Sequence, residues 1–440
     1  MPPSTLRARR DDPRALAKWL YSWLLVGAVS YALGMLAPLL ILELGGTVLE
    51  VSLASLTYYA SLTAGSIIWG WAADVVPRRR PPVIASAAGL ALTPTAMALS
   101  GSIPGIIAWY AVGAFLYAAL VVYLNLLVVE TTDRGQWSEN ARRGFIYLVT
   151  GSAVGTALGL PSVALSGALP GLLRYAELST AAGAAGAAIL YAFVREPPMT
   201  LERRALLSFP NVFISRLTSL PLIFLSVPRL FDLKALGKRI RRIPGSELSV
   251  LTLANALFSA SAQMFFTVYI PYEESVGLSE AQVLISYLYM STVNALAAAL
   301  LADELRRPSY RLASRGMGIR ALGMLAAAAF STFTVGPDAL YATMLSFTFI
   351  AFAYTIITVT MNALLYASMV PGTRGRSLGA YSTAGSLSFM IGSLVSGLIV
   401  RSFGYQLDFF ASAATVMVAA AVVELYYGSS GSTAESIEVY

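Results

Sequence analysis

The residues of this chain that could do chemistry are carboxylates and guanidinium groups, because the sequence contains no histidine and no cysteine. Without them the chain has no thiolate nucleophile, disulfide, imidazole metal ligand or histidine proton relay. We also find no spacing typical of metal ligands, no nucleophile beside a base and no glycine-rich phosphate loop. The sequence therefore predicts no catalytic residues, no metal, no cofactor and no binding of nucleic acid, which indicates a protein that is not an enzyme.

One cluster of charged residues occurs twice. The first copy comprises Gly70, Asp74, Arg78, Arg79 and Arg80. The second comprises Asp303, Arg306, Arg307 and Arg311, with Ala299 in the place of the glycine. An aspartate at a helix end can hold an arginine or the N-terminus of a neighbouring helix, and such a contact can form and break as parts of a protein move. The repeated cluster therefore predicts a conformational gate, although each single arginine could instead only orient the chain in a membrane.

The elements that must position these clusters are long apolar segments. The 440 residues are 57% hydrophobic and only 12% charged, with a mean hydropathy of +0.69, which does not fit a water-soluble core. Segments of about twenty apolar residues, the length needed to span a bilayer, recur along the chain. We predict an all-α integral membrane protein with twelve spans at 18–42, 48–72, 81–100, 103–129, 143–165, 173–194, 248–271, 279–302, 312–335, 338–365, 378–401 and 405–427.

The charges predict how these spans are threaded. With the N-terminus in the cytoplasm, all 30 Lys and Arg residues except Arg174 and Arg401 fall on the cytoplasmic side, as the positive-inside rule requires. We therefore expect a multi-pass protein of the cytoplasmic membrane with both termini in the cytoplasm. The basic stretch Lys234 to Arg242 is expected to lie on anionic lipid headgroups. The predicted divisions are an N-terminus (1–17), a six-helix half (18–194), a basic linker (195–247), a second six-helix half (248–427) and an acidic tail (428–440).

The two charged clusters and the segment from Pro371 to Gly385 closely resemble the major facilitator superfamily. The resemblance implies a fold of twelve transmembrane helices in two parallel, pseudo-symmetric six-helix bundles. It also implies a secondary transporter that works by alternating access, with its small-molecule substrate between the halves. In that family Asp74 would belong to the gate. We further expect a monomer.

Polar side chains on spans one, four, seven and ten, which the family places at its centre, are candidates to line a substrate cavity. Span seven carries a polar stripe along one helical face. The candidates are Ser30, Tyr31, Tyr117, Asn125, Thr252, Asn255, Ser259, Gln263, Thr348, Thr355 and Asn362. The alternative for each of them is a hydrogen bond between helices that involves no substrate.

Span five carries a groove of small residues, formed by Gly151, Gly155 and Gly159 and followed by Pro161. Close helix packing is the plain interpretation of this spacing. The groove also resembles a degenerate form of a motif associated with exporters, which favours efflux over import. A matching face on span eleven comprises Gly385, Ser388, Gly392 and Ser396.

The expected substrate follows from the placement of charges. We assign no ionisable residue to the middle of a span and interpret the carboxylates near span ends, including Asp408, as interfacial. Proton coupling would then use an end carboxylate such as Glu50, or the protein is a facilitator. An anionic substrate would require a buried arginine, and we expect none. The sequence thus predicts a transporter of a small neutral or lipophilic solute, with efflux favoured. The alternatives are a facilitator or importer of sugars or other neutral metabolites, and a membrane sensor that does not transport.

Overall fold

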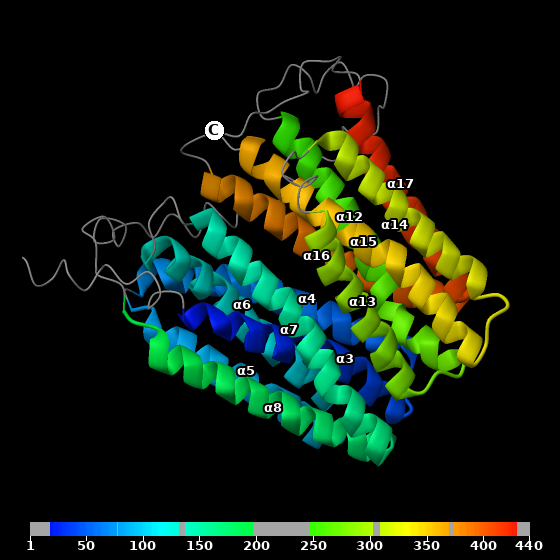
Figure 1. The fold of residues 1–440 in the computed structure, drawn as a ribbon, viewed down its shortest axis with the longest axis horizontal. Coiled ribbons are helices and arrows are strands. Elements are labelled where there is room, and N and C mark those ends of the chain that lie inside the picture. The colour runs from blue at the N-terminus through cyan, green and yellow to red at the C-terminus, as the bar shows by residue number, and fades with distance from the viewer. Residues whose placement is uncertain are drawn as a thin grey trace, which may run out of the picture. The chain divides into compact units, whose positions relative to one another are not determined.

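A computed structural model of the chain describes residues 18–76, 78–131, 137–196, 246–301, 309–368 and 374–428, which form twelve α-helices and one short 3-10 helix (Figure 1). The first half contains η1 (Lys18–Tyr21), α3 (Ser22–Glu43), α4 (Val48–Val75), α5 (Arg80–Leu99), α6 (Ile103–Thr131), α7 (Trp137–Ser166) and α8 (Ala168–Phe193). The second half contains α12 (Ser246–Ser275), α13 (Glu280–Leu300), α14 (Tyr310–Phe330), α15 (Pro337–Ser368), α16 (Arg374–Phe403) and α17 (Tyr405–Gly428). The predicted all-α class is confirmed.

Ten of these helices are long and apolar enough to cross a membrane. The two helices outside this set are α13 and α14, each 21 residues long. In α14 the apolar sequence is interrupted by Arg311, Arg315 and Arg320. The predicted N-terminal segment lies outside the described residues, as do most of the basic linker and most of the acidic tail.

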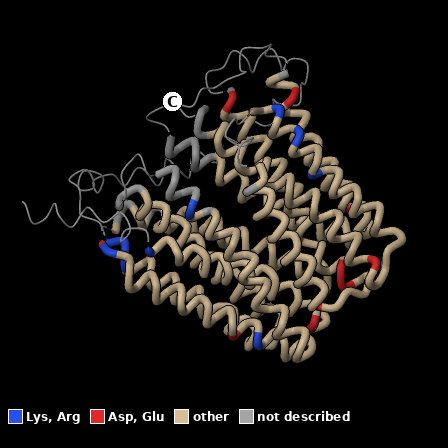
Figure 2. The backbone as a smooth tube through the Cα atoms, in the orientation of Figure 1, with Lys and Arg blue, Asp and Glu red and all other residues tan. Residues whose placement is uncertain are grey.

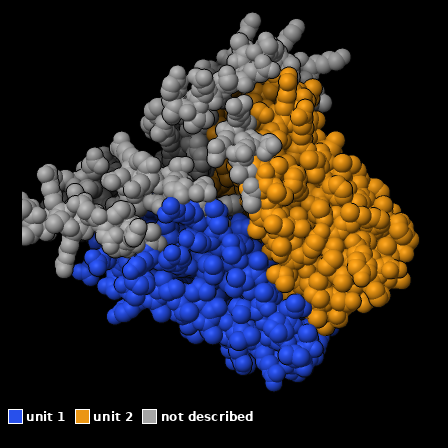
Figure 3. All heavy atoms as spheres, viewed as in Figure 1, with its two compact units in different colours: residues 1–45, 61–208 blue, residues 46–60, 209–440 orange. Residues whose placement is uncertain are grey.

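The chain forms two compact units (Figure 3). Unit 1 comprises residues 1–45 and 61–208, and unit 2 comprises residues 46–60 and 209–440. The division between them falls inside α4, so the first turns of this helix group with unit 2.

The helices of the two units pack in matching pairs. In unit 1, α3 packs against α7 and α8, while α5 packs against α6 and α8. In unit 2, α12 packs against α16 and α17, while α14 packs against α15 and α17. In each half, the first helix packs against the fifth and sixth, and the third helix packs against the fourth and sixth. The repeat found in the charged clusters therefore extends to the packing of whole helices.

Glycines make the closest of these contacts. A β-carbon on Gly151 or Gly155 of α7 would collide with a backbone carbonyl oxygen of α3, that of Leu24 or Ala28. In unit 2, a β-carbon on Gly392 of α16 would lie 2.5 Å from the carbonyl oxygen of Ala260 in α12. Small residues allow helix backbones to approach in this way, and such contacts stabilise helix pairs in membranes. Two glycines of the groove predicted on span five thus pack against α3, whereas a β-carbon on the third, Gly159, would meet the Tyr175 ring of α8.

Candidate functional site

The first charged cluster lies between α4 and α5, where Arg79 holds the end of α4. The Arg79 side chain is buried, and its guanidinium donates hydrogen bonds to the carbonyl oxygens of Ala73 and Val76, the latter at 3.0 Å. The last carbonyl groups of a helix have no partner within the helix. Arg79 therefore caps the C-terminus of α4, a role more specific than orienting the chain.

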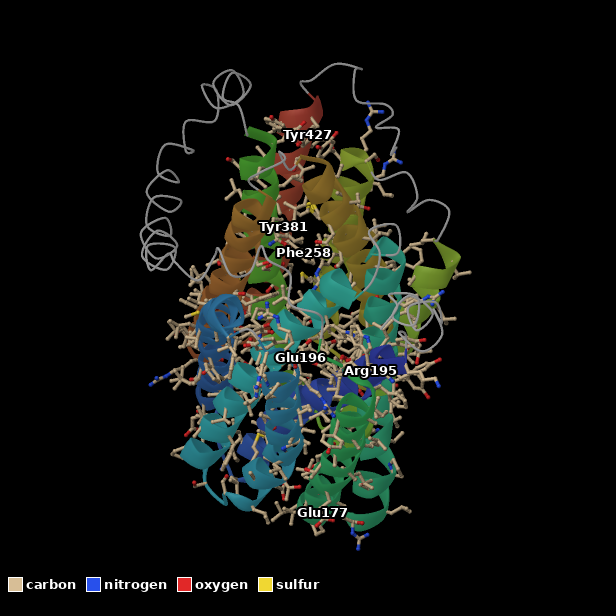
Figure 4. All side chains as sticks on the ribbon, turned by 90° about the vertical axis from the view of Figure 1, so that its left-hand side faces the viewer. Glu177, Arg195, Glu196, Phe258, Tyr381 and Tyr427 are labelled. Carbon is tan, nitrogen blue, oxygen red and sulfur yellow. The ribbon has the colours of Figure 1, made fainter. Side chains whose placement is uncertain are left out.

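Glu196, which follows α8, holds the start of α5. Its carboxylate accepts hydrogen bonds from the backbone N–H groups of Arg79 and Arg80, the latter at 3.1 Å. The Arg80 guanidinium donates to the carbonyl oxygen of Tyr191 at 2.9 Å and lies over the Tyr191 ring. Figure 4 shows Arg195 and Glu196 at this end of α8, with Glu177 toward the other end. The Glu196 carboxylate thus accepts hydrogen bonds from two backbone N–H groups at the N-terminus of α5, where the helix dipole favours a negative charge.

Sequence reasoning missed Glu196 as part of this cluster. The available signal was a carboxylate directly after a span, on the side where positive charge predominates. The side chain of Asp74 lies outside the description, as do Asp303, Arg306 and Arg307. Gly70 lies within α4, and Arg78 and Arg311 are exposed. The gate role of the two aspartates therefore stays a prediction.

In unit 1, the cavity candidates bond within their own helices or are only half-buried. Ser30 donates to the carbonyl oxygen of Val26 at 2.8 Å, and Asn125 donates to that of Val121 at 2.8 Å. Asn125 is exposed, while Tyr31 and Tyr117 are half-buried. These hydrogen bonds within a helix do not test a role in a cavity, which stays a prediction for these residues.

In unit 2, three candidates join neighbouring helices. The Thr355 hydroxyl donates to the Asn294 side-chain oxygen at 2.5 Å, which joins α15 to α13. The Thr348 and Tyr289 hydroxyls make a second link between these helices at 2.8 Å. Asn255 donates to the backbone carbonyl oxygen of Tyr381 at 3.4 Å and joins α12 to α16; Figure 4 labels Tyr381. Hydrogen bonding between helices, the alternative weighed for each residue, accounts for these three contacts.

The remaining candidates of unit 2 bond along their own helices or are described only by their burial. Gln263 is buried and donates to the Thr267 hydroxyl at 2.8 Å. Thr252 donates to the carbonyl oxygen of Leu248 at 2.7 Å. Ser259 is buried and Asn362 is half-buried. A cavity along the α12 stripe therefore stays a prediction.

The expectation that no arginine is buried in a span is wrong. Arg320 is 1% exposed and lies ten residues from each end of α14, about 15 Å along the helix axis. Figure 2 shows that most other charged residues of the described part lie nearer the helix ends. A charge at such a depth costs about 2.5–3.5 kcal/mol even on the lenient insertion scale. The charge count assigned Arg320 to the cytoplasmic side with its neighbours on α14, so its depth was missed.

Two carboxylates near helix ends are also buried within the protein. Asp408 was expected at the interface, yet it has no exposed surface in the first turn of α17, where it lies beside the Ser396 hydroxyl of α16. Glu273 is fully buried near the end of α12. Its carboxylate accepts a hydrogen bond from the Ser286 hydroxyl of α13 at 2.6 Å. Helix packing, which the sequence does not reveal directly, encloses both acids.

Comparison with known proteins decides the family. The model of the Major Facilitator Superfamily matches residues 20–388. The chain belongs to the major facilitator superfamily. It is therefore a multi-pass membrane protein of a transporter family, and not an enzyme. No curated protein matches the sequence.

Solved structures share the fold of this major facilitator superfamily protein. A POT family transporter in complex with 5-aminolevulinic acid is 13% identical with a TM-score of 0.70, and the match covers 95% of this chain and 97% of that one. The inward-open xylose transporter XylE from E. coli is 14% identical with a TM-score of 0.66, over 93% and 94% of the two chains. A mutant of the nucleoside transporter NupG is 12% identical with a TM-score of 0.68, over 94% and 99%.

Within this superfamily protein, Glu50 has a structural role that sequence reasoning did not assign to it. Its carboxylate accepts hydrogen bonds from the backbone N–H of Thr47 at 2.6 Å and from the Thr47 hydroxyl at 3.0 Å. This arrangement caps the N-terminus of α4. A role of Glu50 in proton coupling stays a prediction.

Proposed function

We propose that this chain is a secondary transporter that moves a small organic solute across the cytoplasmic membrane by alternating access. The matched helix pairs of the two units support this proposal most directly, since parallel repeats of this kind are a transporter architecture. The solved relatives include a xylose transporter, a nucleoside transporter and a POT family transporter with bound 5-aminolevulinic acid. Small polar organic molecules are thus the range of substrates to test first.

The sequence analysis restricted the substrate to neutral or lipophilic solutes because it expected no buried arginine. Arg320 is buried, so this restriction no longer applies. We therefore widen the proposal to charged solutes. Export, which the glycine groove of α7 favoured, remains the proposed direction. Gly151 and Gly155 of that groove also have a packing role, since they contact the α3 backbone.

Proton coupling is a second candidate property of the transporter, favoured by the burial of Glu273 and Asp408. Carboxylates inside membrane helices commonly carry protons in pumps and transporters. A facilitator would need no such groups. An imposed pH gradient in proteoliposomes distinguishes the two: accumulation against a concentration gradient supports coupling, whereas flux that ignores the gradient supports a facilitator.

Counterflow in proteoliposomes tests the transport proposal itself. Purified protein would be reconstituted and assayed with labelled sugars, nucleosides, amino acids, dipeptides and organic acids, with protein-free liposomes as the control. We expect specific flux of one class, and slower flux with unchanged binding in Asp74→Asn. The absence of flux for every class would count against a transporter and favour the sensor alternative.

The absence of native cysteine makes the proposed orientation easy to test, because a single introduced cysteine is the only one that can be labelled. We expect Ser102→Cys to react with an impermeant maleimide added to intact cells. Arg78→Cys is the matched control and should react only after the cells are opened. The reverse pattern would invert the proposed topology.

A further inference from the structure

The buried guanidinium of Arg320 is the least explained charged group in the described part of the chain. All three of its nitrogens are buried, and none has a hydrogen-bond partner among the described residues. The guanidinium carbon lies 5.1 Å from the ring centre of Phe258 and 5.6 Å from that of Phe266. Aromatic faces attract a cation, but they satisfy none of its N–H donors.

The surroundings of Arg320 form a distinct site inside unit 2. Phe258, Ala262 and Phe266 recur at four-residue spacing and so share one face of α12, with the small Ala262 between the two rings. Figure 4 labels Phe258 among the helices of this unit. Tyr354 of α15 is the ionisable group that interacts with the guanidinium. Side chains from α12, α14 and α15 thus converge on one buried positive charge.

The buried carboxylates of unit 2 lie too far away to neutralise this charge. The Ser261 hydroxyl of α12 lies 3.6 Å from the Met324 sulfur of α14 and donates to the Ser412 carbonyl oxygen of α17 at 2.7 Å, so these three residues share one level. Arg320 is four residues before Met324 on α14, and Asp408 is four residues before Ser412 on α17. Because these two helices run antiparallel, Arg320 and Asp408 lie one helical turn from the shared level in opposite directions.

At a rise of 1.5 Å per residue this places Arg320 and Asp408 about 12 Å apart along the helix axes. Glu273 is twelve residues beyond Ser261 on α12, in the direction of Asp408, which puts it about 24 Å from Arg320 by the same measure. An arginine side chain does not reach either distance. The buried carboxylates in the described part of unit 2 therefore do not balance the charge of Arg320, and an anion bound beside it would do so.

We propose that Arg320 is an anion-binding subsite that takes the carboxylate of a small organic acid with an apolar body. The subsite deepens the proposed transport function and rests on it. The planar guanidinium offers paired N–H donors that match the two oxygens of a carboxylate. The Phe258 and Phe266 rings suit an apolar body beside that carboxylate. A single positive charge fits a monovalent carboxylate better than a phosphate dianion, and Arg320 is the one buried cation in the described part of unit 2.

Binding of matched acids and amides to the purified full-length protein tests this subsite. Benzoate is compared with benzamide, and butyrate with butyramide, by calorimetry and thermal shift; inorganic phosphate is the third probe. We expect the wild-type protein to bind each acid at least about tenfold more tightly than its amide, as hydrogen bonds to a charged group imply. Arg320→Gln should abolish this preference and Arg320→Lys should retain part of it. Arg315→Gln, which changes an exposed arginine of the same helix, is the control and should leave the preference intact.

Equal binding of acid and amide by the wild-type protein would overturn the proposal, and this comparison needs no variant that might fail to fold. An unchanged preference in folded Arg320→Gln would overturn it too, as would tighter binding of phosphate than of benzoate. Counterflow with the same probes separates the two proposals. Selective binding of acids without flux would refute the transport function alone, whereas flux of neutral solutes with no preference for acids would refute only the subsite.

Discussion

Replacing Gly155 by alanine tests the packing of α7 on α3, because the new β-carbon would enter the backbone of the neighbouring helix. It would overlap the Ala28 carbonyl oxygen and lie 3.0 Å from the carbonyl carbon and from the α-carbon of the same residue. A backbone group cannot rotate away as a side chain can. The two helices must therefore separate or shift along their contact.

The size of the effect follows from two opposing contributions. Overpacking of a well-packed contact costs about 1–3 kcal/mol. Alanine is favoured over glycine within a helix by about 1 kcal/mol. Since the collision involves backbone atoms, we expect the steric cost to fall in the upper part of its range and the net loss to be about 1–2 kcal/mol.

Gly318→Ala supplies the matched control. Gly318 also lies within a helix, α14, but a β-carbon there would meet nothing within 4 Å. This variant should gain the helix preference alone and become more stable by up to about 1 kcal/mol. The difference between the two variants isolates the steric cost, because both gain the same preference.

Unfolding in mixed micelles of mild detergent and dodecyl sulfate measures both variants on the purified protein. Gly155→Ala should unfold at a lower dodecyl sulfate fraction than the wild-type protein, and Gly318→Ala at an equal or higher one. If both variants shift in the same direction by the same amount, the close contact between α7 and α3 is wrong.

Three further outcomes follow from the buried and capping groups. Asp408→Asn should raise the melting temperature at neutral pH, because it removes the cost of burying a charge; a lower melting temperature would indicate a stabilising partner for the carboxylate. Glu196→Gln should lower the unfolding free energy by about 0.3–1 kcal/mol, since a neutral side chain interacts less with the N-terminus of α5, and added salt should diminish the difference. Thr355→Val should cost about 0.6 kcal/mol in the same micelle assay through its lost hydrogen bond to Asn294, and no change would argue against that bond.

Much of the fold could be predicted because lipid imposes strong rules on sequence. Length and hydropathy alone indicated the spans, and the repeat of the charged clusters indicated two related halves. Arg79 of the first charged cluster caps α4, while its part in a gate stays a prediction.

The site was less predictable because its main features depend on which helix faces meet. The depth of Arg320 could not be read from a charge count, since the positive-inside rule treats every arginine of a short segment alike. The burial of Glu273 and Asp408 has the same origin, because each lies near a helix end that other helices cover. The partners of Thr355 and Asn255 likewise come from separate helices, and no periodicity within one helix identifies them.

The backbone contacts that glycines make have a mechanical consequence. Between α7 and α3, and between α16 and α12, no long side chains separate the backbones at these glycines, so no change of side-chain rotamer can absorb a small displacement there. Sliding one helix past the other would require a step of about one turn. We therefore expect each helix pair to move as a rigid unit. Motions of the protein should instead change the contacts between other helices.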